Sequence, residues 1–260
     1  MINENVIFQD LKRKTVVVTG AGEGIGESIA KAFVAQGSKV ILISRNELKW
    51  AAEIECNNIT FLKSDIRDIG YLDDWLSKYI SAGNCIDILV NNAGMISQKK
   101  LMDTAEPEWE EMIGVNSKAT FFLTQLFAKH MIVNKHGNII FAGSFAASMP
   151  SYSYGLYAAS KAMIASLSKS FAAELAPYNI RVNSFSPGVI KTKMTEHARK
   201  SNEDKMLNDI SLFRFGDSSE VANAVLFLAS ELSSYIHGVD LDVSGGKYIV
   251  QNSSLSRDVT

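Results

Sequence analysis

The chain has 260 residues, of which 47% are hydrophobic and 21% charged, and its 26 basic and 28 acidic residues give a net charge of −2. This composition is ordinary for a globular protein and argues against a disordered or fibrous chain, while the near-neutral charge gives no electrostatic footprint for nucleic acid or an anionic membrane. Two cysteines support neither a disulfide framework nor a zinc site, so no metal is expected. Because no apolar run approaches the ~20 residues of a membrane-spanning helix and the N-terminus lacks a signal-peptide pattern, the expected location is the cytoplasm.

Short β-branched runs alternate along the chain with longer helical patterns. The runs are nearly apolar on both faces, as expected of parallel strands that helices cover on both sides. The expected strands are 15–20, 39–44, 58–62, 85–90, 137–143, 179–185 and 239–243, and the expected helices are 25–36, 46–55, 70–82, 107–134, 156–176 and 218–230. The alternation predicts an α/β fold: a single-domain, doubly wound (Rossmann), mostly parallel sheet with helices on both faces, over residues 1–260.

Two segments depart from this alternation. Residues 190–211 are highly charged and too long for a simple connection, which favours a substrate lid over a solvated helix. Residues 251–260 form a polar tail that is expected to be loosely ordered.

A glycine-rich turn follows the first strand and passes directly into a helix. It reads Thr19-Gly20-Ala21-Gly22-Glu23-Gly24-Ile25-Gly26. Glycines let the backbone turn sharply and approach a diphosphate, whose charge is favoured at a helix N-terminus. A glycine motif alone is a weak signal, but strand, loop and helix in this order predict a nucleotide site. The expected contacts are Gly20, Glu23, Gly24, Ile25 and Gly26.

The TGxxxGxG spacing resembles that of the short-chain dehydrogenase/reductase family, and further motifs continue the resemblance over roughly residues 12–246. These motifs are Asn91-Asn92-Ala93-Gly94 after the fourth strand, Asn116 within a helix, Ser144 after the fifth strand, Tyr157 and Lys161 as a YxxxK pair, and a loop with Pro187, Gly188 and Thr192. The resemblance implies an NAD(P)-dependent dehydrogenase or reductase. It makes Ser144, Tyr157, Lys161 and Asn116 the catalytic residues, and it adds Asn92, Ala93, Gly94, Tyr157, Lys161, Pro187, Gly188, Val189 and Thr192 as cofactor contacts.

The residue types suit proton transfer beside a hydride transfer. Tyr157 and Lys161 are four residues apart and therefore share a helix face. A nearby ammonium stabilises a phenolate and lowers the tyrosine pKa from ~10, so that Tyr157 can exchange a proton with a carbinol or carbonyl oxygen. Ser144 can donate a hydrogen bond to the same oxygen. The resemblance further implies that Lys161 holds the nicotinamide ribose and that Asn116 anchors a water in a proton relay.

The end of the second strand bears on the choice of cofactor. Ser44 is uncharged, and the guanidinium of Arg45 offers a fork of donors for a 2′-phosphate, which favours NADP(H) over NAD(H). Glu23 argues the other way, because many NADP-using relatives carry a basic residue there. Asp65, with the adjacent Ile66, matches a family position near the adenine, although Asp65 could instead cap the following helix.

The expected substrate pocket is apolar and aromatic, with few charges. Its candidates are Ser144, Phe145, Ala146, Met149, Tyr152, Tyr154, Gly188, Val189 and the lid, with Met95 and Ile96 as additions. Segments 214–216, 220–230 and 242–246 resemble those of 3-oxoacyl-(acyl-carrier-protein) reductases, which implies a reductase of a 3-oxoacyl thioester. Such enzymes need basic surface at the mouth of the site; here turn 135–138 contains a lysine, but turn 177–179 has no basic residue.

Two alternatives remain open at this stage. A sugar or polyol dehydrogenase would share the same motifs, and a non-catalytic nucleotide sensor would share the fold but would need no Ser144, Tyr157 and Lys161. The expected partner is a small-molecule or thioester-linked ketone or alcohol. The resemblance also implies a homo-oligomer, a dimer or tetramer, formed through helices 107–134 and 156–176.

Overall fold

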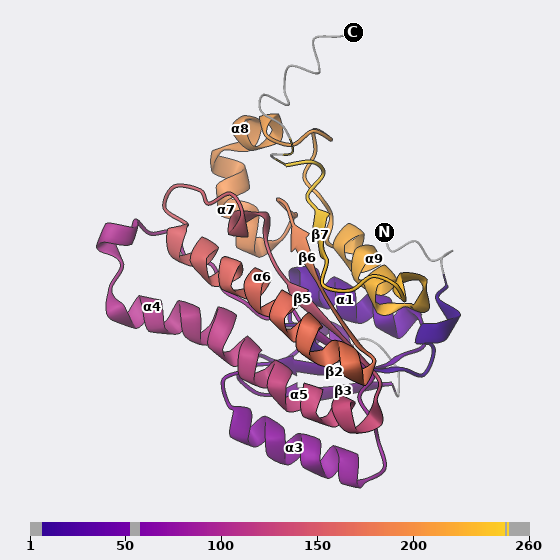
Figure 1. Ribbon diagram of the computed structural model, residues 1–260. Coiled ribbons are helices and arrows are strands. Elements are labelled where there is room, and N and C mark those ends of the chain that lie inside the picture. The colour runs from indigo at the N-terminus through magenta and orange to yellow at the C-terminus, as the bar shows by residue number, and fades with distance from the viewer. Residues whose placement is uncertain (1–6, 53–57, 248, 250–260) are drawn as a thin grey trace.

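A computed structural model describes residues 7–52, 58–247 and 249, and within them the chain forms one seven-stranded sheet (Figure 1). The strand order is β3-β2-β1-β4-β5-β6-β7, and every neighbouring pair is parallel. The strands are β1 (Thr15–Thr19), β2 (Lys39–Ser44), β3 (Ile59–Lys63), β4 (Ile88–Asn91), β5 (Gly137–Ala142), β6 (Ile180–Pro187) and β7 (Asp240–Val243). The predicted doubly wound sheet is confirmed, and its order reverses between β1 and β4.

The main helices are α1 (Gly24–Ala35), α2 (Lys49–Ala52), α3 (Ile69–Ser81), α4 (Glu106–Ile113), α5 (Thr120–Asn134), α6 (Gly155–Leu175), α7 (Lys193–Ser201), α8 (Glu203–Asn208) and α9 (Ser218–Ala229). The predicted helix over 107–134 is formed by α4, a π-helical turn η3 (Gly114–Ala119) and α5 in succession. Part of the predicted helix over 46–55, and the predicted polar tail 251–260, lie outside the described residues.

The strands are apolar on both faces because each face packs against its own helices. In β1, Val16 and Val18 belong to the buried cluster with α1 and α9, whereas Val17 between them belongs to the cluster with α3, α5 and α6. Figure 1 shows these two helical layers on opposite sides of the sheet. Successive side chains of a strand point to opposite faces, so a strand covered on both sides needs no polar alternation.

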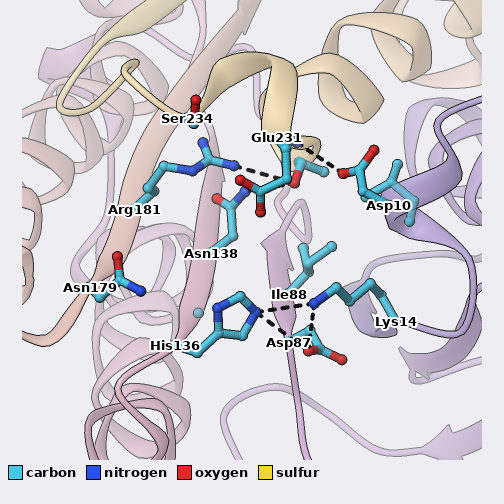
Figure 2. Close-up of a pocket in the computed structure, with 13 residues that line it drawn as sticks. Asp10, Lys14, Asp87, Ile88, His136, Asn138, Asn179, Arg181, Glu231 and Ser234 are labelled. Atoms are coloured by element: carbon cyan, nitrogen blue, oxygen red, sulfur yellow. Dashed lines mark hydrogen bonds and ion pairs between the residues drawn. The ribbon is translucent and has the colours of Figure 1, made fainter.

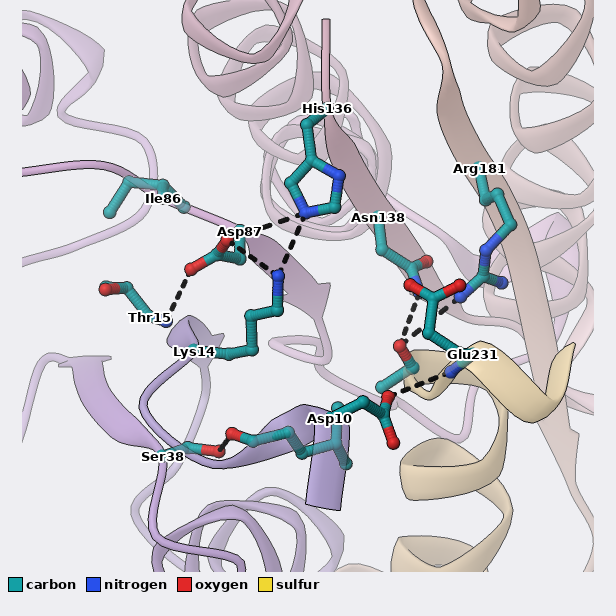
Figure 3. A network of polar contacts seen from close by, with 12 residues as sticks. Asp10, Lys14, Thr15, Ser38, Ile86, Asp87, His136, Asn138, Arg181 and Glu231 are labelled. Atoms are coloured by element: carbon teal, nitrogen blue, oxygen red, sulfur yellow. Dashed lines mark hydrogen bonds and ion pairs between the residues drawn. The ribbon is translucent and has the colours of Figure 1, made fainter. Parts of the chain in front are cut away.

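A polar cleft lies at the amino-terminal edge of the sheet, and its charges hold elements of the fold together (Figure 2). The Arg181 guanidinium donates hydrogen bonds to the carbonyl oxygens of residues 228–230, at the C-terminal end of α9. In Figure 3, Asp87 meets the Lys14 ammonium at 3.4 Å and the His136 ring at 3.5 Å, and it accepts a hydrogen bond from the Thr15 N–H at 2.8 Å. The charged side chains in the cleft are therefore engaged in contacts between elements of the fold.

No helix in the described ranges combines the length and apolarity needed to cross a bilayer. The candidate catalytic and cofactor residues predicted from the sequence lie at the opposite edge from this cleft, where the carboxyl ends of the strands meet.

Candidate active site

The glycine-rich loop turns tightly from β1 into α1. Gly20 has φ +66° and Gly24 has φ +62°, a backbone conformation that side chains with a Cβ rarely adopt. A Cβ at Gly20 would also lie 2.7 Å from the Ala93 Cα, so this position admits only glycine. Glu23 precedes α1 without capping it through its side chain, and the first N–H groups of the helix therefore face the loop. The arrangement fits a diphosphate at the helix N-terminus.

The Asn-Asn-Ala-Gly segment after β4 supports this loop from the neighbouring strand. Asn92 Nδ2 donates to the Thr19 and Gly20 carbonyl oxygens at 3.1 and 3.3 Å. The Thr19 hydroxyl accepts the backbone N–H groups of Asn92 and Ala93, each at 3.0 Å. The two loops that meet where the strand order reverses are thus fixed to each other, at the position where open α/β sheets bind ligands.

Asn116 lies in the π-helical turn between α4 and α5 and is 1% exposed. Its Oδ1 accepts the Met95 N–H at 2.8 Å, and its Nδ2 donates to the Met95 carbonyl and to Ser160 Oγ, both at 2.9 Å. A Cβ on Gly94 would lie 3.4 Å from this Oδ1 and 3.6 Å from Lys161 Nζ. Asn116 therefore joins the loop after β4 to α6 in the immediate surroundings of Lys161. The π turn, a feature frequent at functional sites, was not predicted.

Ser144, Tyr157 and Lys161 come together where β5 ends and α6 begins. Ser144 precedes the short η4 (Phe145–Ala147), and its Oγ accepts the Ala146 N–H at 3.2 Å. Tyr157 and Ser144 are joined by a side-chain hydrogen bond. Lys161 is 5% exposed; its Nζ donates to the Ala142 carbonyl at 2.8 Å and lies 5.9 Å from the Tyr157 ring centroid.

The electrostatics of this group differ from the expectation that Lys161 lowers the tyrosine pKa. Burial raises the pKa of Tyr157, and the hydrogen bond with Ser144 opposes that shift only in part. Burial also lowers the pKa of Lys161, to about 8. The expected lowering of the tyrosine pKa by Lys161 is not found in this structure, where the ammonium is directed to the Ala142 carbonyl and burial is the larger influence on the pKa of the phenol.

The adenosine end of the expected cleft lies beside the end of β2. A Cβ on Gly22 would lie 3.4 Å from Ser44 Oγ, which places Ser44 against the glycine loop, and Arg45 next to it is exposed. Asp65 is held by Arg67, with Oδ2 2.7 Å from the guanidinium NH2, and this pair lowers the pKa of Asp65. Asp65 does not cap α3; Asp68 does, by accepting the Tyr71 N–H. Ile66 is buried.

The loop after β6 connects the expected nicotinamide end to segment 190–211. A Cβ at Gly188 would lie 2.6 Å from the Ser244 Cα, so the loop packs against the chain that leaves β7. Thr192 precedes α7, and its Cγ2 would lie 3.1 Å from a Cβ on Gly24. Segment 190–211 contains α7 and α8, which stand above the end of the sheet (Figure 1).

The predicted substrate residues are gathered less closely than the others. Phe145 and Ala146 form η4 directly beside Ser144, and Val189 is buried. Met149 and Tyr152 are exposed, and Tyr154 is the residue before α6.

Comparison with known proteins identifies the family. A family model described as enoyl-(acyl carrier protein) reductase matches residues 20–247. The 3-oxoacyl-(acyl-carrier-protein) reductase of Chlamydia pneumoniae is 38% identical over 238 residues, which cover 90% of this chain and 96% of that protein. The chain belongs to the short-chain dehydrogenase/reductase family. The resemblance found in the sequence is confirmed, and the chain is an enzyme, an oxidoreductase of this family.

Other short-chain dehydrogenase/reductase proteins of similar identity differ in their named substrates. The 2-dehydro-3-deoxy-D-gluconate 5-dehydrogenase of Bacillus subtilis is 38% identical over 243 residues, 91% of this chain and 95% of that protein. The ligand-free structure of Thermoplasma acidophilum aldohexose dehydrogenase superimposes with a TM-score of 0.85 at 31% identity, covering 94% of this chain and 97% of that one. Family membership thus shows an oxidoreductase and does not identify its substrate.

Proposed function

We propose that this enzyme interconverts a ketone and a secondary alcohol with NADP(H), using Tyr157 as the acid and base. The observation that carries the proposal is the hydrogen-bonded pair of Ser144 and Tyr157, with buried Lys161 one helical turn away, at the same sheet edge as the glycine loop. The glycine cradle and the N-terminus of α1 fit a dinucleotide, with Lys161 and Thr192 as side-chain donors for its nicotinamide half. When bound, the nicotinamide supplies or accepts the hydride.

The protonation states suit reduction of a ketone near neutral pH. Because burial raises the pKa of Tyr157, its phenol keeps its proton and can donate it to the carbonyl oxygen of the substrate. Ser144 stabilises the same oxygen through its hydroxyl as negative charge develops there. Lys161, with a pKa of about 8, can exchange a proton near neutrality and can restore the proton of Tyr157. Asn116 positions this group from the π turn.

Support for NADP(H) over NAD(H) comes from the end of β2. Ser44 lies beside the glycine loop and carries no negative charge that would repel a 2′-phosphate. The exposed guanidinium of Arg45 can donate hydrogen bonds to that phosphate. The opposing charge of Glu23 is paired with Lys193 of α7 at 2.8 Å, which weakens the objection that Glu23 raises.

For the substrate we propose a 3-oxoacyl thioester or a similar ketone. The support is the 38% identity to a 3-oxoacyl-(acyl-carrier-protein) reductase over nine-tenths of the chain and the apolar surface of η4 beside Ser144. A sugar or sugar-acid substrate is the second candidate. Turn 177–179 lacks a basic residue for an acidic carrier, and an equally identical relative is named as a dehydrogenase of a sugar acid.

One panel of assays tests both candidates. We expect NADPH oxidation with acetoacetyl thioesters to exceed NADP⁺ reduction with any of a set of sugars, polyols and aldonates. Turnover confined to the second group would transfer the assignment to the sugar candidate. A chain that binds no pyridine nucleotide would contradict the proposed function altogether.

A further inference from the structure

A lysine that the proposed reaction does not use is buried at the same edge of the sheet. Lys247 follows β7 by four residues, and its side chain is only 3% exposed. The Nζ lies 5.4 Å from the ring centroid of Phe145, the residue directly after Ser144. The backbone N–H of Lys247 donates to Ser244 Oγ at 3.0 Å, and Ser244 is the residue that packs against Gly188. The side chain of Lys247 therefore lies beside Phe145, and its backbone lies beside the residue that packs against Gly188; Phe145 and Gly188 are both expected substrate residues.

A buried ammonium in an apolar pocket needs a negative partner. Removing such a charge from water is unfavourable, and a nearby carboxylate offsets the cost. Burial lowers the pKa of Lys247, and Asp209 opposes that shift. The distance from Lys247 Nζ to Asp209 Oδ2 is 3.6 Å, longer than the ~2.7–2.9 Å of a direct ammonium–carboxylate hydrogen bond.

The carboxylate that offsets this charge comes from the expected lid. Asp209 follows α8 directly and is one-third exposed, so it lies at the boundary between the pocket and solvent. The lid chain then runs along the chain after β7: Ile210 pairs with Lys247 in an antiparallel bridge, and the Leu212 N–H donates to the Gly245 carbonyl at 3.0 Å. These contacts hold the backbone of Asp209 beside Lys247, so only the Asp209 side chain would have to turn away for another carboxylate to take its place.

We propose that Lys247 determines substrate specificity by binding a carboxylate on the substrate, in the place that Asp209 takes in this structure. The proposal rests on the proposed interconversion of a ketone and a secondary alcohol in this pocket, and not on the thioester as its substrate. Its substrate class is a keto or hydroxy acid whose carboxylate lies away from the reacting carbon, which corresponds to the second of the two substrate candidates above, the sugar acid. The ring of Phe145 supplies the aromatic face beside which the Lys247 ammonium lies.

Two pairs of probe substrates, each differing in one charge, test the proposal. Gluconate and glucitol are offered with NADP⁺, and acetoacetate and ethyl acetoacetate with NADPH. We expect the unmodified enzyme to favour the charged member of the better pair at least tenfold in kcat/KM. Lys247→Met should lower kcat/KM for that member ten- to a hundredfold through KM and leave the neutral member within threefold. Lys247→Arg should keep the preference.

Asp209→Asn separates a substrate-binding lysine from a lysine that only fastens the lid. If Asp209 occupies the carboxylate position, Asp209→Asn should lower KM for the charged member about two- to fivefold. If the ion pair between Lys247 and Asp209 only holds the lid in place, Asp209→Asn and Lys247→Met should lower kcat/KM equally for charged and neutral substrates. Lys78→Met, an exposed lysine in the last turn of α3, is the matched control and should change neither ratio.

The outcomes distinguish this proposal from the proposed function. Equal losses for both members of a pair, or a preference of the unmodified enzyme for the neutral members, overturn the role of Lys247. Turnover that Tyr157→Phe leaves intact would count against the proposed function instead. If none of the four compounds is turned over, thermal unfolding of the NADP⁺-saturated enzyme with gluconate and with glucitol decides. The proposal then requires gluconate to raise the unfolding temperature more than glucitol does, and Lys247→Met to abolish that difference. If there is no such difference, or if Lys247→Met keeps it, the proposal is overturned.

Discussion

Lys193 of α7 and Glu23 of the glycine loop form an ion pair, with Nζ 2.8 Å from Oε2 across 170 positions of the sequence. The contact joins the expected lid to the loop that is expected to hold the diphosphate. The ammonium offsets a carboxylate that would otherwise repel the phosphates of a dinucleotide. Both side chains are largely exposed, so the attraction is screened and its contribution is small.

Lys193→Met should therefore weaken cofactor binding modestly. The unpaired Glu23 carboxylate would repel the more highly charged NADP⁺ more than NAD⁺, so we expect KM to rise about two- to fivefold for NADP⁺ and less for NAD⁺, with the difference shrinking as salt is added. Steady-state kinetics at low and high ionic strength measure the effect. Lys78→Met controls for the loss of a surface charge, and an NADP⁺ KM that does not respond to Lys193→Met would mean that the pair has no part in cofactor binding.

Tyr157→Phe removes the hydroxyl and keeps the ring. Since the phenol is the proposed proton donor, kcat should fall at least a hundredfold, while the Kd for the dinucleotide stays within a few-fold because Lys161 and the glycine loop are untouched. Stopped-flow assays and fluorescence titration with NADPH separate the two quantities. Near-normal turnover by the variant would remove Tyr157 from the reaction.

Arg45→Asp should reverse the preference between the two dinucleotides. A single charge-assisted hydrogen bond is worth roughly 1.5–3 kcal/mol, and a carboxylate at the end of β2 would both repel a 2′-phosphate and accept the ribose hydroxyls. The ratio of kcat/KM for NADPH over NADH should fall more than tenfold. An unmodified enzyme that uses NADH as well as NADPH would contradict the proposed preference at the outset.

The fold was predictable because its signal is local and repeated. β1 and β2 match their predicted ranges within one residue, since apolar β-branched runs bounded by glycine or polar residues leave little choice of position. The start of β4 was placed three residues early, because the apolar Cys85 and Ile86 precede the strand in sequence but are not part of it. The cytoplasmic location, the single domain and the oligomeric state stay predictions.

The site was predictable only as far as its motifs extend. Ser144, Tyr157 and Lys161 were predicted from the family motifs and lie together in the structure, but the direction of the Lys161 ammonium depends on the Ala142 carbonyl, which no motif reveals. The alternative role of Asp65 as a helix cap was wrong, because its carboxylate accepts hydrogen bonds from the Arg67 guanidinium and Asp68 caps α3 instead; its expected role near the adenine stays a prediction. Lys247 was missed because its position beside Phe145 depends on a contact between residues about a hundred positions apart in the sequence.

Asp87 at the amino-terminal edge should stabilise the fold in a pH-dependent way. Burial alone would raise the pKa of Asp87, but the hydrogen bonds with His136 and the Thr15 N–H and the Lys14 ammonium together lower it. A carboxyl group whose pKa is lower in the folded state than in the unfolded state binds protons preferentially on unfolding. Its stabilisation is therefore complete above the unfolded value of ~3.9 and is lost as the pH falls through the lower folded value.

Asp87→Asn should accordingly lower the free energy of unfolding by about 1–3 kcal/mol at pH 7, because the Lys14 ammonium and the Thr15 N–H lose a charged acceptor at a half-buried site. The difference between the two proteins should shrink as the pH falls below about 4. Urea unfolding from pH 7 down to pH 3 measures it, with Asp74→Asn on the exposed face of α3 as the control. A difference that stays constant over this range would show that the stabilisation comes from packing and hydrogen-bond geometry, because only an ionised carboxylate loses its contribution on protonation.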